Sequence, residues 1–176
     1  MFKAFGQFVK RRRYLREQSQ IGRCSVYFVD NCAVIFPQSL PNILVPRRRV
    51  KAIFVTVDDS AGIGRIVSEL LEESKQITAA GKKWKASDAI AAFFEDIEAF
   101  RHLIKMGKRS FESQLSLISI TQMQGSITLC PRRKAHGRYA YEAIQDSLST
   151  QIVLAKSASD LGIEKVLSRW LTSITN

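Results

Sequence analysis

Apolar residues recur at steps of three and four along residues 87–106, which predicts a helix with one buried face. Ser87 supplies an N-cap and Gly107 a natural stop. The apolar stripe of this helix consists of Ile90, Phe93, Phe94, Ile97, Phe100, Leu103 and Ile104. We expect this helix to be the best-defined element of the chain, and to be buried along five residues of the stripe: Ile90, Phe93, Phe94, Ile97 and Phe100.

Three further helices are predicted from the same spacing. One follows the capping residues 58–60 and places its apolar side chains on one face. A C-terminal helix follows the cap at residues 157–160. Residues 1–20 combine regularly spaced phenylalanines with a basic opposite side, which predicts a basic amphipathic helix. Such a helix either packs on the body of the protein through its phenylalanines or lies on a membrane surface.

Short runs rich in β-branched and aromatic residues predict strands. Residues 24–29 and 32–36 flank the turn residues Asp30 and Asn31, which indicates a hairpin. Residues 118–121 and 126–130 alternate apolar and polar, which predicts a second hairpin with one buried face, ended by Pro131. Residues 51–57 and 152–155 predict two more strands. Pro37 and the two prolines after it predict irregular chain.

These elements indicate an α/β (α+β) fold with a mixed, largely antiparallel sheet packed against three to four helices. The length of 176 residues suits a single domain spanning residues 1–176, and the 45% hydrophobic content is that of a globular protein. We expect neither a membrane-spanning segment nor a secretory signal, because no sufficiently long apolar run follows a charged start. Three cysteines, an odd number, fit a reducing compartment, so the expected location is cytoplasmic.

The net charge of +11 is concentrated in three segments. Residues 1–23 carry +6, residues 45–51 carry +4 and residues 132–138 carry +4, so the remaining residues sum to −3. Clustered positive charge attracts anions, which could be a nucleic acid, an anionic lipid surface or an acidic protein surface. The candidate binding residues are the exposed bases of two clusters, with Trp84 as an aromatic anchor: Arg47, Arg48, Arg49, Trp84, Arg132, Arg133, Lys134, His136 and Arg138.

The sequence offers no support for catalysis. It contains no phosphate-binding glycine loop, no nucleophile elbow and no paired cysteine motif. His102 and His136 could serve as the acid and base of a metal-free ribonuclease, but two histidines occur by chance in a chain of this size. We therefore expect no enzyme, no catalytic residues, no metal and no cofactor.

Three stretches resemble the immunity proteins of bacterial contact-dependent growth inhibition systems (the CdiI type). The first runs from Pro46 through the strand at 51–57 to Leu70–Ser74, the second is Phe111–Pro131, and the third runs from Ile152 to Arg169. The order and spacing of these stretches carry the resemblance, which covers about residues 45–171.

The resemblance implies a cytoplasmic protein that binds and neutralises the C-terminal toxin domain of a large secreted or surface effector. It also implies that this toxin is a nuclease and that the immunity protein is not an enzyme. We expect a one-to-one complex in which the basic residues above face acidic groups of the toxin. The alternative is a nucleic-acid-binding protein that uses its clustered bases on phosphates.

Overall fold

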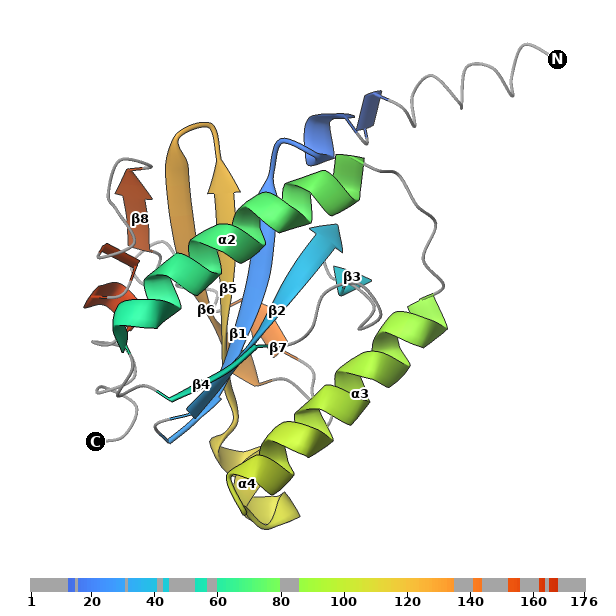
Figure 1. Ribbon diagram of the computed structural model, residues 1–176, viewed down its shortest axis with the longest axis vertical. Coiled ribbons are helices and arrows are strands. Elements are labelled where there is room, and N and C mark those ends of the chain that lie inside the picture. The colour runs from blue at the N-terminus through green and yellow to red at the C-terminus, as the bar shows by residue number, and fades with distance from the viewer. Residues whose placement is uncertain are drawn as a thin grey trace, which may run out of the picture.

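The chain folds into one mixed α/β domain (Figure 1). The computed structural model describes residues 13–14, 16–30, 32–40, 43–44, 53–56, 60–79, 86–134, 141–143, 152–155, 162–163 and 165–167. Its elements in chain order are β1 (Gly22–Val29), β2 (Cys32–Leu40), β3 (Ile43–Leu44), β4 (Ile53–Thr56), α2 (Ser60–Ala79), α3 (Ala86–Leu103), α4 (Lys108–Gln114), β5 (Ser116–Met123), β6 (Ser126–Lys134), β7 (Tyr141–Ala143) and β8 (Ile152–Ala155). The predicted fold class is confirmed.

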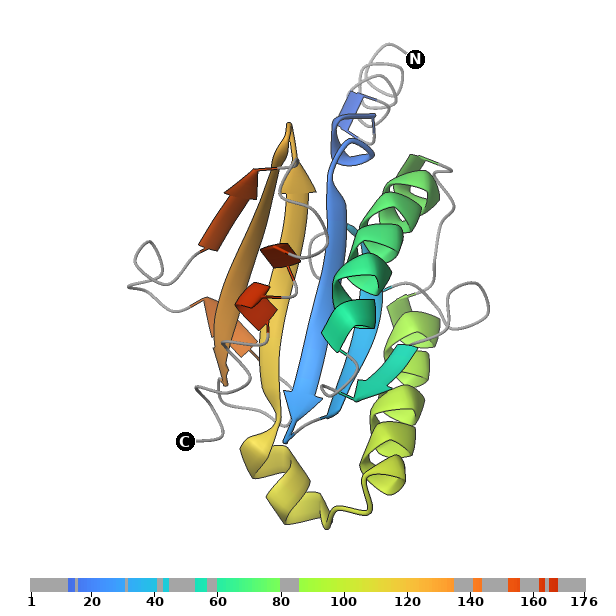
Figure 2. The same ribbon diagram turned by 60° about the vertical axis from the view of Figure 1, so that its left-hand side comes forward.

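The strands form one sheet, and every strand pair that the structure describes is antiparallel. Four long strands make its centre in the order β2–β1–β5–β6 (Figure 2). The outer edge of β2 pairs with β4 and β3, and the outer edge of β6 pairs with β8 and β7. Each edge of the central sheet is therefore covered by two short strands in tandem.

Both predicted hairpins are confirmed. In the first, Val29 pairs with Cys32 across the turn, and Asp30 has a positive φ of 50°. In the second, residues 124–125 connect β5 to β6, and both have positive φ, 43° at Gln124 and 86° at Gly125. Two consecutive residues with positive φ are typical of the type I′ turn, whose twist matches that of the strands it joins.

Pro37 and Pro131 lie inside strands, which corrects the expectation of irregular chain at the first and of a strand end at the second. Pro37 pairs with Cys24 on β1, and Pro131 pairs with Ile118 on β5. On the outer side, Pro37 falls between the parts of β2 that pair with β4 and with β3. Pro131 falls between the parts of β6 that pair with β8 and with β7. A proline has no N–H to donate, so a strand tolerates it where its outer edge is unpaired.

Helix α2 crosses one face of the sheet, and the C-terminal helical residues 162–163 and 165–167 lie beside it (Figures 1 and 2). Val67, Leu71 and Ile163 are fully buried against this face. The helix approaches β1 closely at Gly22, where an added Cβ would lie 2.6 Å from the carbonyl oxygen of Leu71. The glycine therefore sets the distance between helix and sheet.

Helices α3 and α4 pack on the opposite face of the sheet, over β1 and β2 (Figure 1). The ring of Phe93 lies 5.3 Å from that of Phe36 and 5.4 Å from that of Tyr27, measured between centroids. Phe100 and Phe111 join the two helices at 5.9 Å and are fully buried. Because both faces of β1 and β2 are covered, these strands are apolar along most of their length.

The predicted burial of α3 is confirmed for Phe93, Ile97 and Phe100 and is wrong for Phe94, and the side chain of Ile90 is not among those described. Phe94 is 43% exposed and Leu103 is 63% exposed. Successive helical residues are rotated by about 100°, so Phe94 points away from the sheet when Phe93 faces it. The apolar stripe is wider than the surface that the helix covers.

Helix α3 also ends earlier than the sequence predicts. Its last residue is Leu103, and Lys105 takes a positive φ of 56°. The backbone N–H of Met106 donates to the carbonyl of Arg101 at 3.2 Å, which closes this turn. Gly107, the predicted stop, instead precedes α4. Phe111 is the buried residue of that helix.

Candidate functional site

The sheet face opposite α2 is divided into an apolar half and a polar half. The apolar half lies under α3 and α4 and contains Tyr27, Val34 and Phe36. The strand register places the polar side chains beside it on the same face. They come from four neighbouring strands and are Arg23, Ser25, Gln38, Ser119, Thr121, Thr128, Cys130 and Arg132.

Two serines form the centre of the polar half. Ser25 and Ser119 are directly opposite each other on β1 and β5. Gln38 Nε2 donates a hydrogen bond of 2.7 Å to Ser25 Oγ, and Arg132 Nε donates one of 3.0 Å to Ser119 Oγ. Each hydroxyl oxygen thus accepts a bond from a longer side chain on the neighbouring strand. This contact holds the Arg132 guanidinium over β5 and reduces the freedom that it would lose on binding a partner.

The part of this face formed by β5, β6 and β8 is accessible. Ser119, Thr121, Thr128 and Arg132 are half-buried. Two apolar side chains on the same strands are more exposed, Met123 at 47% and Val153 at 62%. We call these six residues the open strand surface. Its described positions include no acidic side chain, so its one charge is the positive charge of Arg132.

Arg23 pairs with Thr121 and so lies beside the open strand surface, but its contacts are structural. It is buried, and its guanidinium donates to the carbonyls of Gln18 and Ile21 and to the side chain of Gln18. Its backbone N–H donates to Ser74 Oγ on α2 at 2.7 Å. Burial lowers the pKa of the guanidinium, and the nearby Tyr14 opposes this effect. Arg23 therefore ties the helical residues before β1 to the sheet and to α2.

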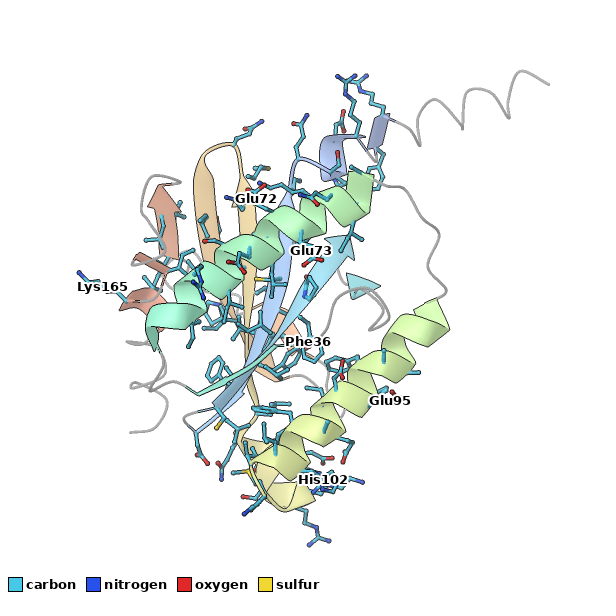
Figure 3. All side chains as sticks on the ribbon, in the orientation of Figure 1. Phe36, Glu72, Glu73, Glu95, His102 and Lys165 are labelled. Carbon is cyan, nitrogen blue, oxygen red and sulfur yellow. The ribbon has the colours of Figure 1, made fainter. Side chains whose placement is uncertain are left out.

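The described residues provide little that resembles catalytic chemistry. Burial raises the pKa of the Cys24 thiol, which disfavours the reactive thiolate. His102 is exposed at the end of α3, and its Nε2 lies 3.0 Å from Arg101 Nη2 (Figure 3). In the part of the chain that the structure describes, no three His, Cys, Asp or Glu side chains gather as metal ligands.

Of the predicted binding residues, Arg132, Arg133 and Lys134 are described. They form the last three positions of β6, opposite Ala143, Glu142 and Tyr141 of β7. The sequence predicts that the strand ends at Pro131, which would place these three residues after it, but β6 continues to Lys134. The other predicted residues lie outside the described residues: Arg47, Arg48, Arg49, Trp84, His136 and Arg138.

No motif in the sequence marks Ser25, Gln38, Ser119 or their neighbours as site residues. The alternation in residues 118–121 and 126–130 does predict one polar face for this hairpin. What it does not give is the lateral order of the strands, which brings Ser25 of β1 opposite Ser119 of β5 across some ninety residues of chain.

The sequence matches no protein-family model, and no curated protein matches it. Solved structures do share its fold. A protein of unknown function from Neisseria meningitidis matches with a TM-score of 0.65 and 13% identity, covering 89% of this chain and 96% of that chain. A chain of the CdiA-CT/CdiI toxin and immunity complex from Yersinia pseudotuberculosis matches with a TM-score of 0.61 and 14% identity, covering 88% and 97%. At these identities, the likeness is one of fold. Among the described residues, no helix is both long and apolar enough to cross a membrane.

Proposed function

We propose that this chain is an immunity protein that binds and neutralises the C-terminal toxin domain of a contact-dependent growth inhibition effector. The observation that carries the proposal is the likeness in fold to a chain of a toxin and immunity complex, over nearly the full length of both chains. The sequence resemblance over residues 45–171 supports it independently, because it rests on the order of short motifs rather than on the fold.

The open strand surface is the proposed centre of the interface. It combines hydroxyls, one guanidinium and the exposed apolar side chains of Met123 and Val153. Protein interfaces have this mixed character, and Met and Arg are enriched in them. A pre-positioned arginine such as Arg132 is also a frequent hot spot, since it loses little side-chain entropy on binding.

The positive charge of the open strand surface indicates a partner with acidic side chains. A surface whose own residues carry a positive charge and no acidic side chain pairs best with a carboxylate, which a guanidinium binds in bidentate fashion. We propose that the toxin presents an acidic patch to Arg132, away from the basic substrate cleft that a nuclease would have. The remaining predicted residues belong to the same proposal as a basic rim: Arg47, Arg48, Arg49, Trp84, Arg133, Lys134, His136 and Arg138.

The proposed mechanism is occlusion without catalysis. One immunity chain binds one toxin domain in the cytoplasm, and its bulk and charge keep substrate from the toxin. Charge complementarity speeds the association and selects the cognate toxin over others. No cofactor is required for such a mechanism, since binding alone blocks the toxin.

The test starts from the gene beside the one that encodes this chain. The C-terminal domain of a large secreted protein encoded upstream is expressed in cells from an inducible promoter, with or without this chain. The proposal predicts that induction stops growth and that co-expression restores it. A growth-stopping domain that this chain leaves fully active would overturn the proposal.

A further inference from the structure

A cationic cluster that the segment charges did not reveal lies at the corner between α3 and α4. Four bases and a histidine fall within nine residues there: Arg101, His102, Lys105, Lys108 and Arg109. The corner is at the lower end of the molecule in Figure 3, where His102 is labelled. Lys165, on the C-terminal helical residues, is labelled at the left-hand side of the same view, away from this corner.

Arg101 shapes this corner. Its Nε donates to Glu98 Oε2 at 2.9 Å, and its Nη1 donates to the carbonyl of Met106 at 3.1 Å. One charge of the cluster is therefore neutralised, and the chain between the helices is fixed in place. The corner is thus held in one conformation by internal contacts.

Lys105, Lys108 and Arg109 are exposed, and the backbone N–H of Lys105 donates to the carbonyl of His102 at 3.1 Å. Two acidic side chains are nearby in the fold. Glu112 is half-buried one turn further along α4, and Asp30 is exposed on the turn between β1 and β2. The bases outnumber these acids, so the corner remains positive.

The topology brings the corner close to the end of β6, which consists of the bases Arg132, Arg133 and Lys134. Leu117 lies three residues after α4 and pairs directly with Arg132. The chain from Lys108 to Leu117 spans at most about 20 Å, from helical and extended rises per residue. Paired strand residues are about 5 Å apart, so the two basic groups lie within about 25 Å of each other.

We propose that the α3–α4 corner, together with Arg132 near the end of β6, binds the phosphate backbone of a nucleic acid when no toxin occupies Arg132. Duplex DNA carries one charge per about 1.7 Å of axis, so about 25 Å of duplex offers roughly 15 phosphates. Separate, flexible bases can each reach a phosphate without a shaped pocket. An acidic protein fits less well, because a protein interface needs an apolar centre and the described corner exposes one large apolar side chain, Leu103.

The experiment measures binding of the purified full chain to a fluorescent DNA duplex of about 20 base pairs, by anisotropy at several salt concentrations. Each contacted phosphate contributes about −0.9 to the slope of log K against log salt. The double variant Lys108→Glu/Arg109→Glu should make the slope less steep by nearly 2 and weaken binding about tenfold or more at low salt. Glutamates in the first turn of α4 complement the helix dipole, so this variant should fold.

The matched control is Arg65→Glu/Lys165→Glu. It changes the net charge equally, from +11 to +7, at exposed positions away from the corner. It should leave the slope unchanged. Asp30→Asn removes the neighbouring negative charge, and asparagine tolerates the positive φ at this position, so it should tighten binding.

Equal weakening by both double variants would overturn the proposal, because it would show attraction to net charge alone. Absence of duplex binding at low salt would overturn it as well. Tighter binding of poly-glutamate than of the duplex, lost in Lys108→Glu/Arg109→Glu, would assign the corner to an acidic protein instead. Lys108→Glu/Arg109→Glu should still protect cells from the toxin. The DNA-binding test and the test of the proposed function can therefore fail separately.

Discussion

Arg132 and Ser119 form the contact that pre-organises the open strand surface: Arg132 Nε donates to Ser119 Oγ at 3.0 Å across β6 and β5. The arginine is offset from the serine along the ladder, since its direct partner is Leu117 and that of Ser119 is Cys130. The guanidinium therefore leans along the sheet, over hydroxyl groups, instead of extending into water. This geometry makes Arg132 the residue whose replacement should affect toxin binding most among those described.

Arg132→Glu should weaken toxin binding by about 30-fold or more, because disrupting a desolvated charge pair costs about 2–5 kcal/mol. Ser119→Ala keeps the charge of Arg132 and removes the hydrogen bond that positions it. This variant should bind the toxin about 3- to 10-fold more weakly, which corresponds to the loss of one hydrogen bond. Titration calorimetry with the toxin domain measures both. Arg65→Glu, at an exposed position on α2, is the control and should change affinity less than twofold or so. Equal losses in Arg132→Glu and Arg65→Glu would contradict the proposed interface.

Phe100 and Phe94 should differ in their effect on stability although both belong to the apolar stripe of α3. Phe100 is fully buried against Phe111, so Phe100→Ala should lower the free energy of unfolding by about 3–5 kcal/mol. Phe94 is 43% exposed, so Phe94→Ala should cost about 1–1.5 kcal/mol. Urea denaturation of both variants checks this. Similar losses would mean that α3 packs in a different rotation about its axis.

Gly22→Ala should destabilise the protein by about 1–3 kcal/mol, because the new Cβ would meet the backbone oxygen of Leu71 at 2.6 Å and push α2 off the sheet. Gly107→Ala is the matched control. An added Cβ there meets nothing within 4 Å, and φ is −66°, so the change should be near neutral. Thermal melting of the two variants compares them. An unchanged melting temperature in Gly22→Ala would show that α2 does not contact β1 at this point.

Stability should decline at alkaline pH. Burial raises the pKa of the Cys24 thiol and of the Tyr27 hydroxyl in the folded protein. In the unfolded chain these groups lose their protons near pH 8.5 and about pH 10 respectively. Above those values the unfolded chain binds fewer protons than the folded one, so unfolding becomes more favourable by up to about 1.4 kcal/mol per pH unit for each group. The stabilising effect is fully present below the unfolded-state pKa.

Urea denaturation at a series of pH values tests this decline. Tyr27→Phe removes the hydroxyl and keeps the ring between Phe36 and Phe93. This variant should show a shallower decline above about pH 10 than the wild-type protein does. An identical decline in both proteins would assign the alkaline effect to other groups.

The sequence predicts the local elements of this fold well, because apolar spacing is a local property. The strand at residues 152–155 matches β8 in the structure, and the two hairpins are where their turn residues indicate. Pro37 and Pro131 show where local rules fail. Whether a proline can remain in a strand depends on which edge of that strand is paired, and that is decided by β3, β4, β7 and β8.

The candidate site was harder to predict for a related reason. A cluster of bases can be recognised in the sequence. The contact that positions Arg132, its hydrogen bond to Ser119 on the neighbouring strand, cannot. The cationic corner at α3–α4 does not stand out in the sequence, because its bases are interspersed with apolar residues that belong to the helical pattern. Both features depend on the arrangement of strands and helices in space.

Neutralisation of a toxin by this chain is measured by mixing the purified chain with the purified C-terminal domain of the effector encoded upstream and following complex formation and toxin activity together. Size-exclusion chromatography with light scattering gives the mass of the complex, and a nucleic-acid cleavage assay gives the residual activity. We expect a one-to-one complex and complete loss of cleavage once the two proteins are equimolar, with Arg132→Glu requiring a large excess. A toxin domain that stays fully active with excess wild-type chain, and elutes separately from it, would show that this chain is not its immunity protein.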